Sequence, residues 1–117
     1  MVKEAIIDFD HLRVFTEGDQ ALERDVLGIF VQQADIWLRD LEDSGDKKSW
    51  TDAAHTLKGS ARGVGAWRIA EICEHAEELV DSSTPTERSI TLGDLKAAVA
   101  ATIQCIELHL KSPQAAE

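Results

Sequence analysis

Apolar residues along most of the chain recur at spacings of three and four positions, which is the periodicity of amphipathic helices rather than strands. This pattern predicts a short helix over about 10–16 and longer helices over about 20–42, from 47 to Gly63 or Gly65, over 66–81, and from 85 to about 111. Four sizeable amphipathic helices with short connections predict an all-α fold, an antiparallel four-helix bundle with a short extra N-terminal helix.

The ends of these helices carry local signals. Asp46 and Ser49 are the candidate N-caps of the helix that begins near 47. The run Thr84-Pro85-Thr86-Glu87 matches a capping box with proline at the first helical position. Gly93 is expected to disturb the last helix. We expect one domain over residues 1–117, in which the bundle covers about 19–111 and the tail 112–117 frays.

The same periodicity assigns each long helix a face toward the core. In the second helix one broad apolar face carries Leu22, Val26, Ile29, Phe30, Trp37 and Leu41. In the fourth helix the core face comprises Ile69, Ala70, Cys73, Ala76 and Val80, and the wet side carries Glu71, Glu74, Glu77 and Glu78. In the last helix it comprises Leu92, Leu95, Val99, Thr102, Ile106 and Leu110.

Composition narrows the functional classes. The 117 residues carry a formal charge of −10, with 44% hydrophobic and 29% charged residues, which are values of a globular domain. The negative balance argues against nucleic acid and against an anionic membrane surface as partners. Cys73 and Cys105 form no C-x-x-C motif, so we expect small buried residues with reduced thiols. With no signal peptide and no apolar run of membrane-spanning length, the expected location is cytoplasmic.

The most informative stretch lies in the third helix, where His55 shares a face with two cations and a glycine. Measured from His55, a helix that turns by about 100° per residue puts Lys58 near −60° and Gly59 near +40°. Arg62 lies near −20° on the same rule. The small and apolar residues fall on the opposite side: Ala53, Ala54, Leu57, Ser60, Ala61 and Val64. If that side faces the core, His55 faces solvent.

This combination meets the requirements of covalent phosphoryl capture. Gly59 costs about 1 kcal/mol relative to alanine inside a helix, and it leaves His55 open to close approach by another molecule. Lys58 reaches a group attached to His55, and a neighbouring cation disfavours imidazolium and so keeps the ring nucleophilic. A solvated helix face that holds a histidine and two cations by chance explains the same residues, so the pattern alone leaves both interpretations open.

The run His55-Thr56-Leu57-Lys58-Gly59-Ser60, continued by Gly65-Ala66, resembles the H-x-L-K-G-S…G-A signature of histidine-containing phosphotransfer (HPt) domains. The resemblance implies a phosphorelay intermediate whose histidine reversibly accepts a phosphoryl group from a receiver-domain aspartate and passes it to another receiver. It implies His55 as phosphoacceptor, Lys58 as phosphoryl-stabilising cation and Gly59 as access residue. Arg62 is not a fixed position of the signature, and its facing suggests a supporting electrostatic role.

The resemblance also implies the partners, which are receiver domains of a hybrid histidine kinase and of a response regulator. The protein is expected to be a monomer and a phosphocarrier rather than an enzyme, and to hold no metal or other cofactor, because the receiver supplies Mg²⁺. Two alternatives stay open: a receiver-binding module that accepts no phosphoryl group, and a dimerisation fragment of a histidine kinase. Thr56 departs from the kinase pattern, which has an acidic residue directly after the histidine.

The second helix has a wider apolar arc than a core stripe requires. Ile29 and Ile36 are therefore candidates for an exposed receiver-docking surface, and Gln32 and Gln33 for a hydrogen bond near His55. Burial of the whole arc under the first helix and the loops is the alternative.

Charged residues are unevenly distributed. Between residues 47 and 68 there are five Lys or Arg and one Asp, a local balance of 5 − 1 = +4 within an acidic chain. We interpret this basic stretch as a positive docking surface around His55. The other histidines predict no metal site, because Ile72 and Ile106 stand three positions before His75 and His109, where di-iron bundles need glutamate.

Overall fold

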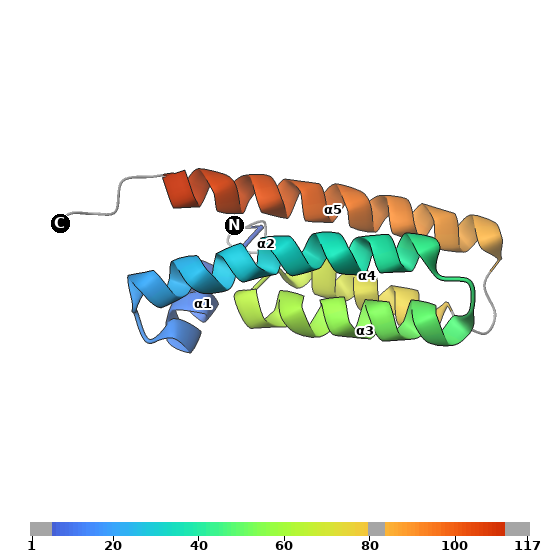
Figure 1. Ribbon diagram of the computed structural model, residues 1–117, viewed down its shortest axis with the longest axis horizontal. Helices are drawn as coiled ribbons and strands as arrows, with labels where there is room; N and C mark the ends of the chain where they lie inside the picture. Colours follow the sequence, from blue (N-terminus) through green and yellow to red (C-terminus); the bar gives the residue numbers. More distant parts are fainter. Residues whose placement is uncertain (1–5, 80–83, 112–117) are drawn as a thin grey trace.

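Five helices make up the regular structure of the computed structural model, which describes residues 6–79 and 84–111. They are α1 (Phe9–Thr16), α2 (Gln20–Asp43), α3 (Lys47–Val64), α4 (Trp67–Glu78) and α5 (Pro85–Lys111). Helices α2 to α5 run along the 52 Å axis of the molecule, and α1 lies at the end where α2 begins and α3 ends (Figure 1). The predicted bundle with a short extra N-terminal helix is confirmed. No helix within the described ranges is long and apolar enough to cross a bilayer.

The predicted caps form as hydrogen bonds. Asp46, rather than Ser49, caps α3, and its side chain accepts the N–H of Ser49 at 2.7 Å. The capping box before α5 is complete: the Thr84 N–H donates to the Glu87 carboxylate at 2.8 Å, and the Glu87 N–H donates to the Thr84 hydroxyl oxygen at 3.1 Å. These bonds satisfy N–H groups that a helix start leaves without partners, so the boundaries are encoded locally.

The turn between α3 and α4 holds α1 on the bundle. Gly65 ends α3 in the left-handed conformation (φ +80°), and its carbonyl accepts the Asp8 N–H at 2.9 Å. A Cβ on Gly65 would lie 2.8 Å from the Asp8 carbonyl oxygen, closer than packing allows. The Asp8 carboxylate also accepts the indole N–H of Trp67 at 3.0 Å. Glycine is therefore required here both by backbone conformation and by the approach of α1.

Two expectations about the helices change. Gly93 does not disturb α5, which is continuous from Pro85 to Lys111, because about 1 kcal/mol at an exposed glycine is small against the burial of Leu95 and Val99 beside it. Helix α4 is helical to Glu78, and the expected end at 81 lies outside the described residues, as do Val80 and the tail 112–117.

The buried face of α2 takes up only part of its broad apolar face. Leu27, Phe30, Ala34 and Leu41 are buried, whereas Leu22 and Ile29, on the broad apolar face of α2, are 42% and 53% exposed. The apolar arc of α2 is wider than the part that packs on α3 and α5, and periodicity alone does not say which part of a wide arc is covered.

The core faces of the other helices agree with the pattern. In α3 Ala53, Ala54, Leu57, Ala61 and Val64 are buried, as is Trp50 near the start of the helix, while Ser60 is half-buried. In α4 Cys73 and Ala76 are buried, and the carbonyl of Ala76 accepts the indole N–H of Trp50 at 2.8 Å, which ties α4 to α3. In α5 Leu95, Val99, Thr102 and Ile106 are buried, and Leu92 and Leu110 lie at the margin.

Candidate functional site

His55 projects from the middle of α3 into solvent, with 70% of its side chain exposed. Leu57, two residues further on, is fully buried on the opposite side of the helix. The outward orientation expected from the spacing of apolar residues is therefore the orientation in the structure.

One carboxylate from α4 joins the two residues singled out on α3. Glu77 Oε2 lies 2.9 Å from Nδ1 of His55, and Glu77 Oε1 accepts a hydrogen bond from Nζ of Lys58 at 2.5 Å. The side chains of Lys58 and Glu77 are only 13% and 18% exposed, so this ion pair is largely shielded from solvent. His55, Lys58 and Glu77 form a single cluster, which we call the His55 cluster.

Glu77 was missed by the sequence interpretation, which placed it on the wet side of α4 with three other glutamates. Its four-residue spacing from Cys73 puts it about 40° from that buried residue on a helical projection, inside the buried arc of α4. That angle was the available signal. The identity of its partners was not available, because it depends on how α4 packs along α3.

The His55 cluster keeps Glu77 ionised. Burial alone would raise the pKa of Glu77, but the hydrogen bonds from Lys58 and His55 outweigh burial and lower the pKa below its ordinary value. Burial raises the pKa of Cys73, one turn earlier on α4, to about 12, with a further contribution from the Glu77 charge. Cys73 is therefore a protonated, unreactive thiol at neutral pH.

An ionised carboxylate only accepts hydrogen bonds, so Nδ1 of His55 carries the hydrogen that it shares with Glu77. In the neutral ring this leaves the lone pair on Nε2, on the solvent side. The expectation that a neighbouring cation acts on the imidazole by itself loses its basis, because the charge of Lys58 is already balanced by Glu77.

Gly59 is exposed, and a Cβ built on it would meet nothing within 4 Å. Gly63, one turn further along α3, is half-buried, and a Cβ built on it would also meet nothing within 4 Å. Neither internal packing nor a positive φ requires glycine at these positions. The surface of α3 beside and beyond His55 is therefore open to another molecule.

Arg62 does not join the His55 cluster. Its guanidinium lies 3.5 Å from a carboxylate oxygen of Glu74, and its carbonyl accepts a hydrogen bond from the ring of His11 at 3.0 Å. Seven residues separate it from His55, about 10 Å along the helix.

The prediction of a positive docking surface is wrong around Lys58 and Arg62. Carboxylates of α4 pair with Lys58 and Arg62, and Asp52 pairs with Lys48 at 2.8 Å. The charge count of a continuous stretch omitted the glutamates that a neighbouring helix brings to the same face.

Of the four candidates on α2, two line a groove beside α3. Ile29 and Gln33 border an apolar groove of about 200 Å³, whose other lining residues are Phe15, Val26, Phe30, Ser60, Gly63 and Val64. Gln32 and Ile36 are exposed but do not line it. The hydrogen-bond partner of His55 Nδ1 comes from α4 and not from the glutamines of α2.

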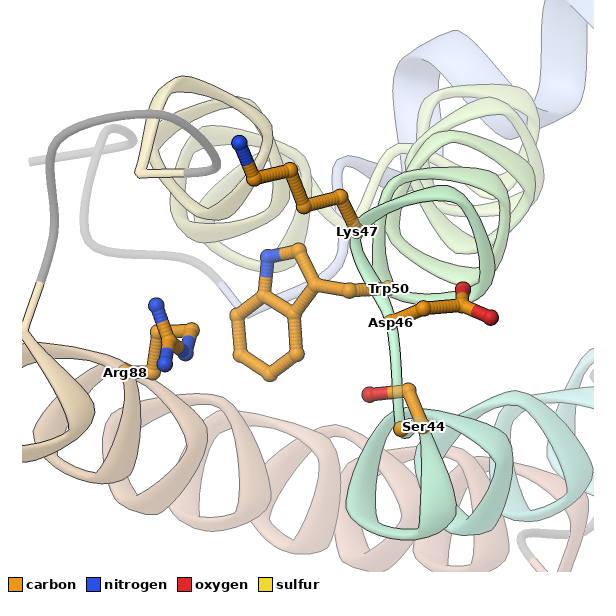
Figure 2. A pocket seen from close by; sticks show the side chains of 6 residues that line it. Ser44, Asp46, Lys47, Trp50 and Arg88 are labelled. Atoms are coloured by element: carbon orange, nitrogen blue, oxygen red, sulfur yellow. The ribbon is translucent and has the colours of Figure 1, made fainter.

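A second hollow, of about 230 Å³, lies at the start of α3 (Figure 2). Trp50 stands between Lys47 and Arg88 in this view, with Ser44 and Asp46 on the side of the α2–α3 connection. Lys47 and Arg88 both make interactions of their own. Lys47 begins α3 eight residues before His55, about 12 Å along the helix, so this hollow is separate from the His55 cluster.

Within the described ranges no group of three or more His, Cys, Asp or Glu side chains is placed to share a metal ion. His109 contacts Glu23 at 2.7 Å and stacks on Phe9, and so joins α5 to α2 and α1.

Comparison with known proteins places the chain among phosphotransfer domains. The family model described as Hpt domain matches residues 25–107. The crystal structure of histidine phosphotransferase ShpA from Caulobacter crescentus is similar, with a TM-score of 0.71 and 34% identity over 91% of each chain. That of histidine-containing phosphotransfer protein B (HptB) from Pseudomonas aeruginosa PAO1 has a TM-score of 0.82 at 20% identity, over 91% of this chain and 95% of the other. No curated protein sequence matches the chain.

Proposed function

Because the chain belongs to the Hpt domain family, whose members are phosphorelay intermediates, we propose that His55 is its phosphoacceptor. In this proposal His55 takes a phosphoryl group from an aspartate of one receiver domain and passes it reversibly to another. The observation that carries it is an exposed imidazole whose Nδ1 is held by Glu77, on a helix face left open by Gly59. Hpt carriers are not kinases, and this chain acts as a carrier charged by its partners.

The nucleophile is Nε2 of His55. Its lone pair attacks the phosphorus of the receiver's aspartyl phosphate in line, the N–P bond forms, and the aspartate carboxylate leaves with the electron pair of the broken P–O bond. Positive charge develops on the imidazole as Nε2 bonds to phosphorus. The Glu77 carboxylate at 2.9 Å from Nδ1 stabilises that charge and holds the ring in the productive orientation.

Lys58 neutralises charge on the phosphoryl oxygens. Its Nζ lies on Glu77 in the structure, one helical turn from His55, and its flexible four-carbon stem allows it to turn toward a phosphoryl group on Nε2. Arg62 has a weaker, long-range electrostatic effect, because its guanidinium is paired with Glu74. Mg²⁺ belongs to the receiver in this proposal, and no residue of this chain has to bind it.

The receiver docks along the open face of α3 and the groove beside it. Gly59 and Gly63 continue the face of His55 toward the groove, where Ile29 and Gln33 of α2 provide an apolar wall and a hydrogen-bonding edge. An apolar side chain of the receiver fills the groove, while Gln32 and Ile36 flank the contact. The partners are receivers of a hybrid histidine kinase and of a response regulator, met by a monomeric cytoplasmic carrier.

The test is phosphoryl transfer from a ³²P-charged receiver domain to this protein, compared with H55Q. The matched control is H75Q, because His75 is another exposed histidine, with 60% of its side chain accessible on α4. Wild type and H75Q are expected to take the label and H55Q to take none. Label on H55Q, or none on wild type, would refute the assignment of His55. Light scattering tests the proposal that the protein is a monomer, and a stable dimer would contradict that proposal.

A further inference from the structure

We propose that Glu77 holds the phosphorylated imidazole of His55 in its protonated, easily discharged form, so that this carrier is built to pass its phosphoryl group on rather than to store it. The inference rests on His55 being the phosphoacceptor and concerns the protonation state of its ring after charging. It starts from the contact between one ionised carboxylate and both Nδ1 of His55 and Nζ of Lys58.

The first step is the proton on Nδ1. Attack by Nε2 leaves an imidazole ring that carries phosphorus on one nitrogen and hydrogen on the other, and such a ring is cationic. It becomes neutral only if Nδ1 loses its hydrogen. A deprotonated Nδ1 would then place its lone pair against the Glu77 oxygen 2.9 Å away, and a carboxylate has no hydrogen to donate. Glu77 therefore favours the protonated ring in the phosphorylated protein.

The second step is the competition for Lys58. Before charging, one Lys58 ammonium balances one Glu77 carboxylate in a cluster that is largely shielded from solvent. A phosphoryl group brings about two negative charges close to the same ammonium. When Lys58 turns to the phosphoryl oxygens, the donor that still contacts Glu77 among the described residues is Nδ1 of His55. The loss of Lys58 thus strengthens the demand for a proton on Nδ1.

Two other cations near this part of the bundle, Arg62 and Lys96, have carboxylate partners other than Glu77 and so do not replace Lys58. Glu74, one turn before Glu77 on α4, is directed to Arg62 of α3. On α5, which packs against α4, Lys96 is paired with Glu42 of α2.

The third step is discharge. The N–P bond breaks, the phosphoryl group passes to a receiver aspartate, and the electron pair stays on Nε2. Since Nδ1 already carries its hydrogen, the leaving group is a neutral imidazole and no proton has to arrive from solvent. A neutral phosphorylated ring would instead have to leave as an imidazolate, which is a much poorer leaving group.

Glu77→Gln separates the charge of this residue from its shape. In the unphosphorylated protein the amide oxygen accepts a hydrogen bond from Nδ1–H. In the phosphorylated protein the amide N–H₂ donates a hydrogen bond to an Nδ1 that has lost its hydrogen. The variant therefore permits the neutral, long-lived phosphorylated ring that Glu77 disfavours. Glu74→Gln is the matched control, because it removes one carboxylate from the same helix without touching His55.

In the experiment, wild type, E77Q and E74Q are phosphorylated with a ³²P-labelled receiver, or with ³²P-labelled phosphoramidate where the receiver is slow. The loss of label from each protein is then followed at pH values from 6 to 9. Wild type and E74Q are expected to lose label at a rate that changes little with pH. E77Q is expected to keep its label at least about tenfold longer at pH 8, and to lose it faster as the pH falls, because its ring then takes a proton from solvent.

A direct measurement is the ¹⁵N spectrum of the His55 ring in the charged protein at pH 8, assigned with H55Q. We expect a protonated Nδ1 in wild type and E74Q and an unprotonated Nδ1 in E77Q. An unprotonated Nδ1 in charged wild type overturns the inference, and so does an E77Q lifetime within twofold of wild type or an equal effect of E74Q. These outcomes leave His55 as phosphoacceptor, whereas failure of wild type to take any label refutes the proposed function itself.

Discussion

Replacing Gly59 by alanine is expected to make the protein more stable and a poorer phosphoryl acceptor. Gly59 lies inside α3 with no positive φ, and a Cβ there meets nothing within 4 Å. Alanine in an exposed helix interior is favoured over glycine by about 1 kcal/mol. With an unfolding entropy of about 2.1 cal/mol/K per residue, 117 residues give about 0.25 kcal/mol/K, so the gain raises Tm by about 4 °C.

The same methyl group occupies the surface one turn from His55, where the receiver has to approach. We expect transfer from a ³²P-charged receiver to slow by at least about tenfold in G59A, since misplacement by about 1 Å costs that much or more. The control is G93A on α5, another exposed helical glycine at which a Cβ would meet nothing within 4 Å. G93A is expected to gain the same stability and to transfer at the wild-type rate.

Thermal unfolding followed by circular dichroism and short-time transfer assays on both variants separate the two effects. A destabilised G59A would mean that Gly59 has a structural role that its open surroundings do not reveal. A stabilised G59A that accepts phosphoryl at the wild-type rate would remove Gly59 from the site.

Three further perturbations test the structure. K58A is expected to slow transfer at least about tenfold and to lower stability by about 1–2 kcal/mol in urea unfolding, because Glu77 loses its charged partner; an unchanged transfer rate would remove Lys58 from the site. G65A is expected to lose about 2–3 kcal/mol, from the left-handed φ and the clash with Asp8, whereas a loss below about 0.5 kcal/mol would contradict that contact. The lowered pKa of Glu77 predicts a contribution to stability that is present above its ordinary value of 4.5 and is lost as the pH falls through the lower pKa of the folded state. Urea unfolding between pH 3 and 7 should therefore show a shallower acid loss in E77Q than in wild type, and identical slopes would refute the charge assignment.

Helix boundaries were predictable because the interactions that set them are local. Asp46 caps α3 through an N–H three residues away, and Thr84 and Glu87 cap each other over the same separation. Gly65 was recognisable as a helix end, but its contact with Asp8, 57 residues earlier in the chain, was not. The signals visible in sequence are those whose partners lie within one helical turn.

The face of α2 shows where periodicity stops being sufficient. Leu22 and Ile29 have the spacing of core residues and are nevertheless exposed, while Leu27 and Ala34 are buried. Hydrophobic spacing identifies an arc, and the packing of α3 and α5 decides which part of a wide arc is covered. The exposed part is what leaves Ile29 available at the groove.

The sequence by itself determined the helices, the bundle, and the outward direction of His55 with Lys58 and Gly59 beside it. These follow from the 3.6-residue period, which is a property of one helix and needs no neighbour. Only the tertiary structure decided that Glu77 binds both His55 and Lys58, 22 and 19 residues away, and that glutamates of α4 pair with two of the five cations of the basic stretch, Lys58 and Arg62. Contacts between helices depend on how far one is shifted along the other, and that shift is set by the packing of the whole core rather than by any local pattern.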